Sequence, residues 1–490
     1  MPRTLIEVDR SSDEPLYQQV RRAIEHGIAV GTFDPLHRLP SSRELSDELG
    51  VSRNTINLAY QELIAEGYVH SEERRGLFVN SEMRRQCHAQ MRDTAPRIDW
   101  SQRIRRAPDT DVPHIEKRMD WHQYPYPFLA GQVDVTAFPS RSWLRCLRDA
   151  LFHPHIYQSL QDSVGSDDPM LVEMICRHLL PARGIEAGPD EVLVTVGSQQ
   201  GLDLLGRALL GPGQTVMIED PGYLDARHIF VRAGADVRCH RVDNAGLQPP
   251  ESLRGTNLLY LTPSHHHPTN VTLSIGRRRQ LLQLAAESGT VVVEDDYDSE
   301  FRYQGRPTPA LKALDSTGDA VYLGTFSKFL SPGLRLGYLV GPAPLVAELR
   351  RIRRYVCRHP SGHLQRALAM LIETGEYHRS LRRYRSKLMC KWEAVCEAVS
   401  RYLPWQEAAF PPGGVSLWMT GPPDLDCRRL VERAEQWGIL IERGDIFFFD
   451  PERGRNHFRI GFSAVPLRSI DDGVRLLAEV ADDVRSERVR

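Results

Sequence analysis

The sequence predicts a multidomain α/β protein, and three observations lead to this fold class. Several short apolar runs rich in β-branched residues, such as Val291-Val292-Val293, end in polar or acidic residues, as buried strands of a largely parallel sheet do. Residues 15–79 instead show short capped helices followed by a β-hairpin pattern. The length of 490 residues allows two or three compact units, at roughly 150 residues per domain.

Composition narrows the class of protein further. A hydrophobic content of 41% and a charged content of 26% are typical of a globular protein. No apolar run approaches the ~18 residues of a membrane span, and the N-terminus is too charged for a secretory signal, so we expect a cytoplasmic protein. The eight cysteines include no CxxC pair, which predicts reduced thiols and no zinc site. A net charge of −2 gives no overall indication of nucleic-acid binding.

The first helices are predicted from spacing and capping residues. Apolar residues in the segment 15–30 recur at helical spacing, at Leu16, Val20, Ile24 and Ile28. The pair Ser41-Ser42 can cap a second helix near 43–49, which Gly50 ends. A short helix that a tight glycine turn joins to a second short helix is the helix-turn-helix pattern, and the segment after Gly50 predicts that second short helix.

That third helix is expected at 53–66, with Ser52 as its cap. Its apolar residues form a stripe that faces inward, at Ile56, Ala59, Tyr60 and Leu63. Two short apolar runs, 68–70 and 77–79, flank a polar turn and predict a β-hairpin, or wing. The polar residues that begin the third helix stand where a recognition helix meets base edges and phosphates. Residues 1–80 are therefore predicted to bind DNA, with an ordinary three-helix structural domain as the alternative.

In the stretch LYQQVRRAIEHGIAVGTF…RLPSSRELSDELGVSRNTINLAYQELIAEGYV, this region resembles the GntR-type winged helix-turn-helix. The resemblance implies binding to double-stranded operator DNA through Arg38, Ser42, Arg43, Ser52, Arg53, Asn54, Thr55, Arg75 and Gly76. The segment carries more acidic than basic residues, so binding must depend on a local basic face. Leu77 stands in the wing where the family often has Ser or Thr.

Residues 81–120 lose helical and strand patterns while Arg, Pro and Asp accumulate, which predicts a flexible linker. An additional arm that grasps DNA is the alternative.

The stretch VVVEDDYDSEF…YLGTFSKFLSPGLRLGY, residues 291–338, carries a chemical prediction. Ligands of open α/β sheets lie at the carboxyl ends of strands, so Asp295 and Lys328 are expected to face one crevice. A lysine there can form a Schiff base with an aldehyde, and a carboxylate can keep a pyridine nitrogen protonated. This combination is the chemistry of pyridoxal 5'-phosphate (PLP). An acidic surface turn beside an unrelated surface lysine is the alternative.

The motifs EDDYDSEF and TFSK.L.PGLRLGY resemble the fold-type-I aminotransferases and, more closely, the MocR group of regulators. The resemblance implies that residues 121–490 form an aminotransferase-like PLP-binding region. Its large domain would span about 165–340, and its small domain about 345–490 with the preceding N-terminal segment. The residues that this resemblance assigns to the cofactor are Ser198, Gln199, Tyr223, His265, Asp295, Tyr297, Thr325, Ser327, Lys328 and Arg335. Arg459 in RIGFS resembles the arginine that clamps a substrate carboxylate, and is expected to bind the effector.

Individual motifs add detail to this prediction. Gly197-Ser198 opens a helix after a strand, where backbone N–H groups favour a phosphate. Three consecutive histidines, 265–267, suggest a metal, but neighbours on a loop do not readily converge on one ion, so no metal site is predicted. The family usually has SHQFPTG here and a histidine at position 416, so His266, His267, Asn270 and Ser416 depart from its pattern. Residues 345–399 predict a solvated, arginine-rich pair of bridging helices.

The resemblance as a whole implies a MocR/GabR-type transcriptional regulator. In this hypothesis PLP is bound to Lys328, an amino compound replaces the lysine by forming an external aldimine, and DNA binding changes in response. Members of the group are head-to-tail, domain-swapped homodimers. Two alternatives stay open: a catalytically active PLP-dependent aminotransferase with an appended DNA-binding domain, and a regulator that senses PLP itself.

Overall fold

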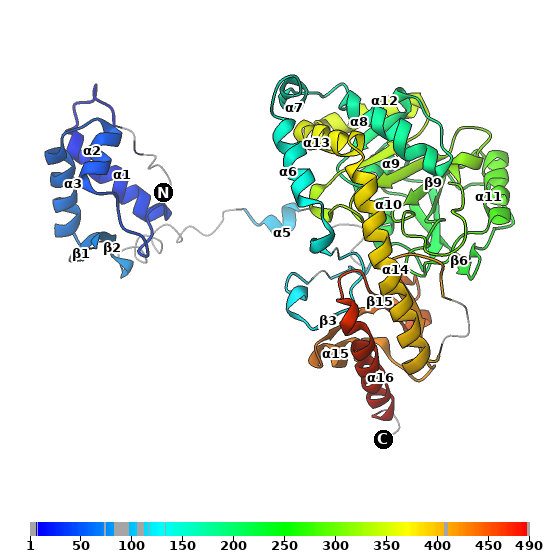
Figure 1. The fold of residues 1–490 in the computed structure, drawn as a ribbon. Helices are drawn as coiled ribbons and strands as arrows, with labels where there is room; N and C mark the ends of the chain where they lie inside the picture. The colour runs from blue at the N-terminus through cyan, green and yellow to red at the C-terminus, as the bar shows by residue number, and fades with distance from the viewer. Residues whose placement is uncertain are drawn as a thin grey trace. The chain divides into compact units, whose positions relative to one another are not determined.

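The protein consists of two compact units, Met1–Arg105 and Arg106–Arg490, shown in Figure 1. The computed structural model describes residues 6, 8–72, 75–82, 98–104, 112–116, 118–132, 134–405 and 410–487.

The N-terminal unit is a winged helix-turn-helix, as predicted. Its elements are α1 (Leu16–Val30), α2 (Ser42–Leu49), α3 (Arg53–Ala65), β1 (Val69–Glu72), β2 (Gly76–Val79) and the short α5 (Trp100–Arg103). Ser41 is the residue that caps α2, because its Oγ accepts from the Glu44 N–H at 3.2 Å and its own N–H donates to Glu44 Oε2 at 2.7 Å. Gly50 ends α2 in the left-handed conformation, with φ 64°.

The core of this unit is made by the apolar stripes that the sequence indicates. Val20, Ile24 and Ile28 of α1 pack with the buried residues of α3 and with Val69 and Val79 of the hairpin. The Leu39 N–H donates to the Leu77 carbonyl at 2.8 Å, so the segment before α2 is held against the wing.

The large subdomain of the C-terminal unit is built on an eight-stranded sheet. The strand order is β4-β11-β10-β9-β8-β5-β6-β7. The strands are β4 (Val192–Thr195), β5 (Thr215–Asp220), β6 (Asp236–Asp243), β7 (Gly246–Leu247), β8 (Leu258–Leu261), β9 (Val291–Asp296), β10 (Val321–Thr325) and β11 (Gly337–Val340). Strand β11 runs antiparallel between β4 and β10, while the run β10-β9-β8-β5-β6 is parallel.

Helices cover both faces of this sheet, because successive side chains of a strand point to opposite faces. On β8, Leu258 and Tyr260 pack in the cluster with α9 (Ser198–Leu209), α10 (Leu224–Arg232) and α12 (Ala343–Val356). Leu259 and Leu261 pack on the other face, in the cluster with α11 (Ile275–Ser288). None of the described helices is both long and apolar enough to cross a membrane.

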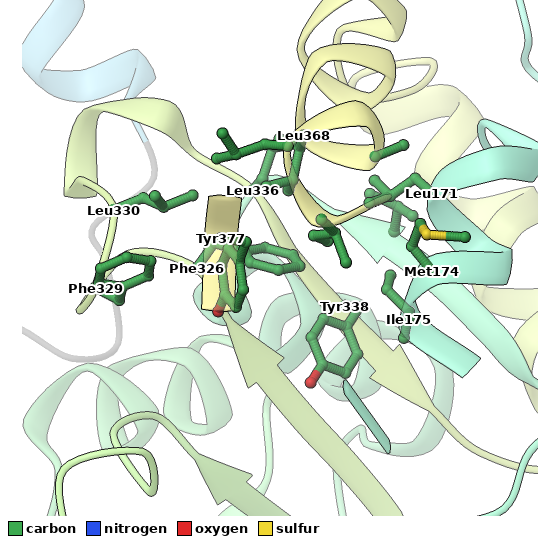
Figure 2. Close-up of a cluster of buried hydrophobic side chains, with 14 of the residues drawn as sticks. Leu171, Met174, Ile175, Phe326, Phe329, Leu330, Leu336, Tyr338, Leu368 and Tyr377 are labelled. Carbon is green, nitrogen blue, oxygen red and sulfur yellow. The ribbon is translucent and has the colours of Figure 1, made fainter. Parts of the chain in front are cut away.

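A second layer of helices packs beside the sheet: α6 (Ser140–Asp149), α7 (Ile156–Leu160), α8 (Pro169–Met174), α13 (Gly362–Glu373) and α14 (Glu376–Tyr402). Figure 2 shows the buried cluster between these helices and the loop after β10, where Phe326, Phe329 and Leu330 meet Leu368 and Tyr377.

The prediction of a solvated helix pair at 345–399 is wrong. The segment forms three helices, α12, α13 and α14, and α13 is largely buried. Arginine content was misleading because some arginines are buried with carboxylates from distant sequence. Arg353 Nη1 lies 2.6 Å from Asp167 Oδ1, and Arg366 Nε lies 2.8 Å from Asp168 Oδ2.

The small subdomain contains a three-stranded sheet, a two-stranded sheet and helices. Its elements, besides the end of α14, are β3 (Tyr126–Pro127), β12 (Ser416–Thr420), α15 (Cys427–Gln436), β13 (Ile439–Leu440), β14 (Glu442–Arg443), β15 (His457–Gly461) and α16 (Ile470–Ser486). Strand β15 lies between β12 and β14, and β3 pairs with β13. The segment before the large sheet therefore joins the small subdomain.

Part of the segment predicted as linker packs on the C-terminal unit. Val112 is buried among Leu224, Trp418 and Phe447. The His114 ring stacks on His228 with centroids 4.3 Å apart. Most of the rest of 81–120 lies outside the described residues, so the extent of the linker stays a prediction.

Candidate functional site

Lys328 lies in the loop after β10, and this loop is anchored by its neighbours. Phe326, Phe329 and Leu330 are at most 3% exposed and belong to the cluster of Figure 2, whereas Lys328 is half-buried. Its Nζ lies 5.4 Å from the centroid of the Tyr297 ring. A Cβ on Gly131 would lie 3.4 Å from the same nitrogen. The amine is thus held at the carboxyl edge of the sheet, with little spare room on the side of Gly131.

Asp295 is the penultimate residue of β9, directly beside the strand that leads to Lys328. It is 4% exposed, and its Oδ2 accepts a hydrogen bond from the Tyr260 hydroxyl at 2.9 Å. Its Oδ1 is also buried but has no hydrogen-bond partner among the described residues. Burial raises the pKa of the Asp295 carboxyl to about 7. A buried acceptor without a donor is costly, which indicates that a ligand donor belongs there.

The acidic neighbours of Asp295 have structural partners instead. Glu294 accepts from the N–H groups of Leu311 and Lys312 at 2.9 and 3.0 Å. Asp296 Oδ2 accepts from Arg183 Nε at 2.7 Å. Asp296 Oδ1, like Asp295 Oδ1, is buried without a hydrogen-bond partner among the described residues, but the Asp296 carboxylate is already paired with the Arg183 cation, whereas Asp295 has only the Tyr260 hydroxyl.

A cation and a helix N-terminus meet at Gly197. This glycine has φ 77° and precedes α9, whose first residues are Ser198 and Gln199. The Arg335 guanidinium lies over it: a Cβ on Gly197 would be 3.0 Å from Arg335 Nη2, which also donates to the Val196 carbonyl at 3.0 Å. The positive end of the helix dipole and the guanidinium together suit a phosphate group.

These features fit PLP. Asp295 Oδ1 matches a pyridine N–H, the Lys328 amine matches an aldehyde, and the Arg335 and α9 end matches a phosphate. Each match uses a different chemical group of this chain at the same edge of the sheet.

The other residues predicted to bind the cofactor differ from one another in what they contact. The Tyr223 hydroxyl donates to Asp225 Oδ2 at 3.0 Å, and its ring lies 5.1 Å from that of His267. Thr325 Oγ1 accepts from the Ser327 N–H at 3.2 Å, which shapes the turn before Lys328. His265 is 2% exposed, and its Nδ1 lies 2.9 Å from Asp298 Oδ1, so its contacts described here hold two loops together.

Arg459 lies on β15 opposite Glu442 of β14. Its Nε and Nη2 lie 2.6 and 2.5 Å from Glu442 Oε2, and its Nη1 lies 2.9 Å from His267 Nε2. The guanidinium carbon is 5.1 Å from the centroid of Phe447. The arginine predicted to bind an effector is thus 6% exposed and already paired with one carboxylate.

The loop after β8 separates its three histidines. His265 faces Asp298, His266 Nδ1 lies 2.7 Å from Thr269 Oγ1, and His267 contacts Arg459. Within the part of the chain that the structure describes, no group of three His, Cys, Asp or Glu residues could hold a metal ion.

Two of the departures from the family pattern contact each other. Asn270 Nδ2 donates to Ser416 Oγ at 3.1 Å, and a Cβ on Gly414 would lie 2.7 Å from Asn270 Cγ. The larger residue at position 270 therefore fills space beside the smaller one at position 416.

The residues predicted to bind DNA gather at the starts of α2 and α3. Ser52 caps α3: its Oγ accepts from the Thr55 N–H at 3.1 Å, and the two hydroxyls are 2.8 Å apart. Arg53 and Asn54 follow it and are exposed, as is Arg43 at the start of α2, whereas Ser42 is half-buried.

The remaining predicted contacts lie near the wing. Arg38 Nη2 is 3.3 Å from Glu44 Oε1, and a Cβ on Gly76 would be 3.9 Å from Arg38. Arg75 pairs with Glu72 at 2.5 Å. Both arginines would have to share or leave these carboxylates to reach a phosphate.

Three site residues were not found from the sequence: Tyr260, Glu442 and Phe447. Tyr260 could have been found from its place in an apolar strand, since a buried tyrosine hydroxyl needs a partner. The sequence carries no signal for Glu442, because its contact with Arg459 depends on strand register.

Comparison with known proteins assigns a protein family to each of the two units. The family model of aminotransferase class I and II matches residues 129–476, and that of bacterial regulatory proteins of the gntR family matches residues 16–79. The transcriptional regulator TauR of Rhodobacter capsulatus is 39% identical over 465 residues, covering 94% of this chain and 96% of that protein. The probable rhizopine catabolism regulatory protein MocR of Rhizobium meliloti is 33% identical and covers 96% and 95%.

Among solved structures, the C-terminal unit is similar to LysN, the α-aminoadipate aminotransferase of Thermus thermophilus. The match has 27% identity and a TM-score of 0.70, and covers 80% of this chain and 100% of that one. That structure is of a complex with N-(5'-phosphopyridoxyl)-L-leucine.

Proposed function

Because this chain belongs to the MocR-type transcriptional regulators, with a GntR-type DNA-binding unit and a PLP-dependent aminotransferase class I and II unit, we propose that it is an amino-compound sensor. In this proposal the C-terminal unit binds PLP and an amino compound, and the N-terminal unit changes its affinity for operator DNA in response.

The observation that carries this proposal is the buried Oδ1 of Asp295 beside the Lys328 loop, for which the described residues offer no hydrogen-bond donor. When bound, PLP supplies an aldehyde that binds amines covalently and reversibly. Asp295 accepts the pyridine N–H, Lys328 provides the resident amine, and Arg335 with the start of α9 binds the phosphate. Thr325 and Ser327 fix the turn that presents Lys328, while Tyr223 and Tyr297 provide aromatic surface.

Sensing then depends on competition between two amines. An amino compound replaces Lys328, and its acid group, if present, binds near Arg459. The released Lys328 amine would take up the proton that the incoming amine gives up and carry its charge near the Tyr297 ring, so its contacts would differ between the two states. A ligand shifts an equilibrium by its difference in affinity for two states, and this difference is what DNA affinity would report.

The DNA contacts in this proposal come from exposed residues of α2 and α3. Arg53 and Asn54 approach base edges and phosphates, with Arg43 at the start of α2. Arg38 and the Arg75-Gly76 turn contact the backbone beside the wing. Ser52 and Thr55 contribute by fixing the start of α3, and Ser42 lies at the first turn of α2.

A second candidate function is a true aminotransferase, favoured by the complete set of cofactor groups at the sheet edge. One titration tests both. Purified protein is titrated with amino compounds while cofactor absorbance, DNA affinity and keto product are measured together. A regulator changes absorbance and DNA affinity together without product beyond the protein concentration. Multiple turnover with unchanged DNA affinity would establish the enzyme instead.

A second titration, of the cofactor-free protein with PLP, distinguishes a regulator that senses PLP itself. In that case removal of the cofactor changes DNA affinity, and amino compounds do not. We further propose that the protein acts in the cytoplasm as a head-to-tail, domain-swapped homodimer. Sedimentation of a monomer at micromolar concentration would contradict the homodimer.

A further inference from the structure

A short segment between the DNA-binding unit and the first strand of the small subdomain packs on the C-terminal unit. The N-terminal unit ends at Arg105. Residues 112–116, which we call the strap, follow it and lie against the C-terminal unit. Val112 is 6% exposed and belongs to one buried cluster with Leu224 and Phe447. Burial of an apolar side chain is favourable, so Val112 holds the strap in place.

The rest of the strap is held by few contacts. The His114 ring stacks on His228 with centroids 4.3 Å apart, and His228 Nε2 lies 2.9 Å from the Pro113 carbonyl oxygen. A cavity of about 310 Å³ lies next to the strap, lined by Ile115 on one side and by Val431 of α15 on another. A segment with few buried contacts opens at low cost in free energy, so the strap can be released without unfolding of the unit beneath it.

The surface that holds Val112 is also a wall of the proposed cofactor pocket. Leu224 directly follows Tyr223, whose ring lies 5.1 Å from that of His267. The Phe447 ring lies 5.4 Å from the same histidine ring. The Gly222 N–H donates to the Phe447 carbonyl at 2.9 Å, so the two parts of this wall are joined. A wall one residue thick thus separates the strap from the pocket.

A shared wall links two binding events. A ligand that fills the pocket restricts the side chains that line it, and the strap then meets a surface that is already ordered. A docked strap restricts the same side chains before the ligand arrives. Such a coupling is reciprocal: the factor by which the ligand favours docking equals the factor by which docking favours the ligand.

We propose that docking of the strap and occupancy of the PLP pocket stabilise each other through Leu224 and Phe447. The state of the pocket then determines how firmly the segment that leads to the DNA-binding unit is held. This inference rests on the proposed function, since it uses the same PLP site, and it adds the route by which that site acts on the tether.

The variant Val112→Cys makes release of the strap measurable. Cysteine behaves as a small apolar residue, so its thiol should be buried at position 112 and should react with iodoacetamide only when the strap is released. Mass spectrometry of the peptide that carries position 112 separates this reaction from that of the eight native cysteines. In the full-length protein, stoichiometric PLP should slow the alkylation about fivefold or more, the lower end of usual coupling factors.

PLP affinity, read from cofactor absorbance, tests the reciprocal effect. Val112→Asp places a charge on the apolar surface and should release the strap, so PLP affinity should fall about fivefold or more. Met119→Asp is the matched control, because it adds the same charge nearby at a residue that is 87% exposed. Its PLP affinity should stay within about twofold of the wild type.

A double variant separates release of the strap from damage to the pocket. His114→Ala removes the ring that stacks on His228, so it should also weaken PLP binding. Once Val112→Asp has released the strap, loss of the stack has nothing further to change. The double variant should therefore bind PLP as Val112→Asp does, whereas two independent disturbances of the pocket would add.

Three results would overturn the inference. An alkylation rate of Val112→Cys that PLP leaves unchanged would show that docking and occupancy are independent. Additive losses in the double variant would assign only a packing role to the strap. Equal losses in Val112→Asp and Met119→Asp would assign the effect to the added charge. The proposed function fails differently, when neither PLP nor an amino compound changes the operator affinity of the wild type, and these three measurements do not depend on DNA.

Discussion

Replacing Asp295 by asparagine should make the stability of the cofactor-free protein less dependent on pH. Burial raises the pKa of Asp295 from its ordinary value of 3.8 to about 7 in the folded protein. The folded protein therefore holds a proton that the unfolded chain has already released, and its stability falls as pH rises from about 4 to about 7. The full effect of this pKa difference is about 4 kcal/mol, at roughly 1.36 kcal/mol per pH unit.

The measurable part lies between pH 5.5 and 8.5. Over the interval from 5.5 to the folded pKa, one proton difference acts across about 1.5 pH units, which amounts to about 2 kcal/mol. The amide introduced by Asp295→Asn would not titrate, so this portion of the pH dependence should disappear. The buried amide also needs an acceptor, which costs about 1–3 kcal/mol at every pH. The comparison between the two pH values cancels that constant cost.

Urea unfolding of the cofactor-free wild type and Asp295→Asn, at pH 5.5 and 8.5, is a suitable assay. Of the seven tryptophans, only Trp100 lies outside the C-terminal unit, so tryptophan fluorescence reports mainly on the unit that contains Asp295. Loss of hydration also raises the pKa of Glu219 to about 8 and that of Glu300 to about 7. Asp295→Asn should therefore lose only the part of the pH dependence of stability that Asp295 contributes, and keep the part that these two glutamates contribute.

Tyr260→Phe is the matched control. It removes the hydroxyl that donates to Asp295 Oδ2 and stabilises the charged form, so the pKa should rise and the stability loss should move to higher pH. With PLP bound, a pyridine N–H on Oδ1 should remove the penalty from the wild type. The reasoning is refuted if the cofactor-free wild type and Asp295→Asn show the same change in unfolding free energy between the two pH values.

The remaining predictions concern cofactor attachment, DNA binding and the phosphate end. Lys328→Ala should lose the visible absorbance of lysine-bound PLP, and borohydride treatment of the wild type should leave a pyridoxyl group on Lys328; a mass shift on another lysine would contradict this. Arg53→Ala should weaken operator binding by about 1–3 kcal/mol with unchanged cofactor absorbance, measured by fluorescence anisotropy. Normal binding by the folded variant would remove Arg53 from the interface. Gly197→Ala should lower PLP affinity at least tenfold by equilibrium dialysis, because its Cβ would lie 3.0 Å from Arg335 Nη2 at φ 77°; unchanged affinity would show that the phosphate binds elsewhere.

The sequence predicted the parts of the site that local pattern controls. Lys328 and Asp295 follow strand runs, and parallel strands bring their carboxyl ends to one edge, so their proximity could be expected before any coordinates. The start of α3 was equally readable, because Ser52 and the apolar stripe behind it are local signals. In each case sequence neighbours determine the geometry.

The parts that were missed depend on pairing between distant segments. The Glu442–Arg459 ion pair requires the register of two antiparallel strands, which no local pattern specifies. The burial of α13 was hidden because Arg366 finds its carboxylate partner at Asp168, far away in the sequence. An arginine that its sequence neighbours predict to be exposed can be buried when the fold places a carboxylate beside it.

The contact between Asn270 and Ser416 also ties the residue at each of these two positions to the residue at the other. Asn270 occupies a left-handed backbone position, φ 60°, which glycine adopts without strain and asparagine tolerates better than most residues. With a histidine still at 416, an asparagine at 270 would collide with it, since Asn270 Nδ2 is only 3.1 Å from Ser416 Oγ. With glycine still at 270, a serine at 416 would leave only a void. Replacing Ser416 alone by histidine would therefore force Asn270 to move, so the residues at these two positions depend on each other.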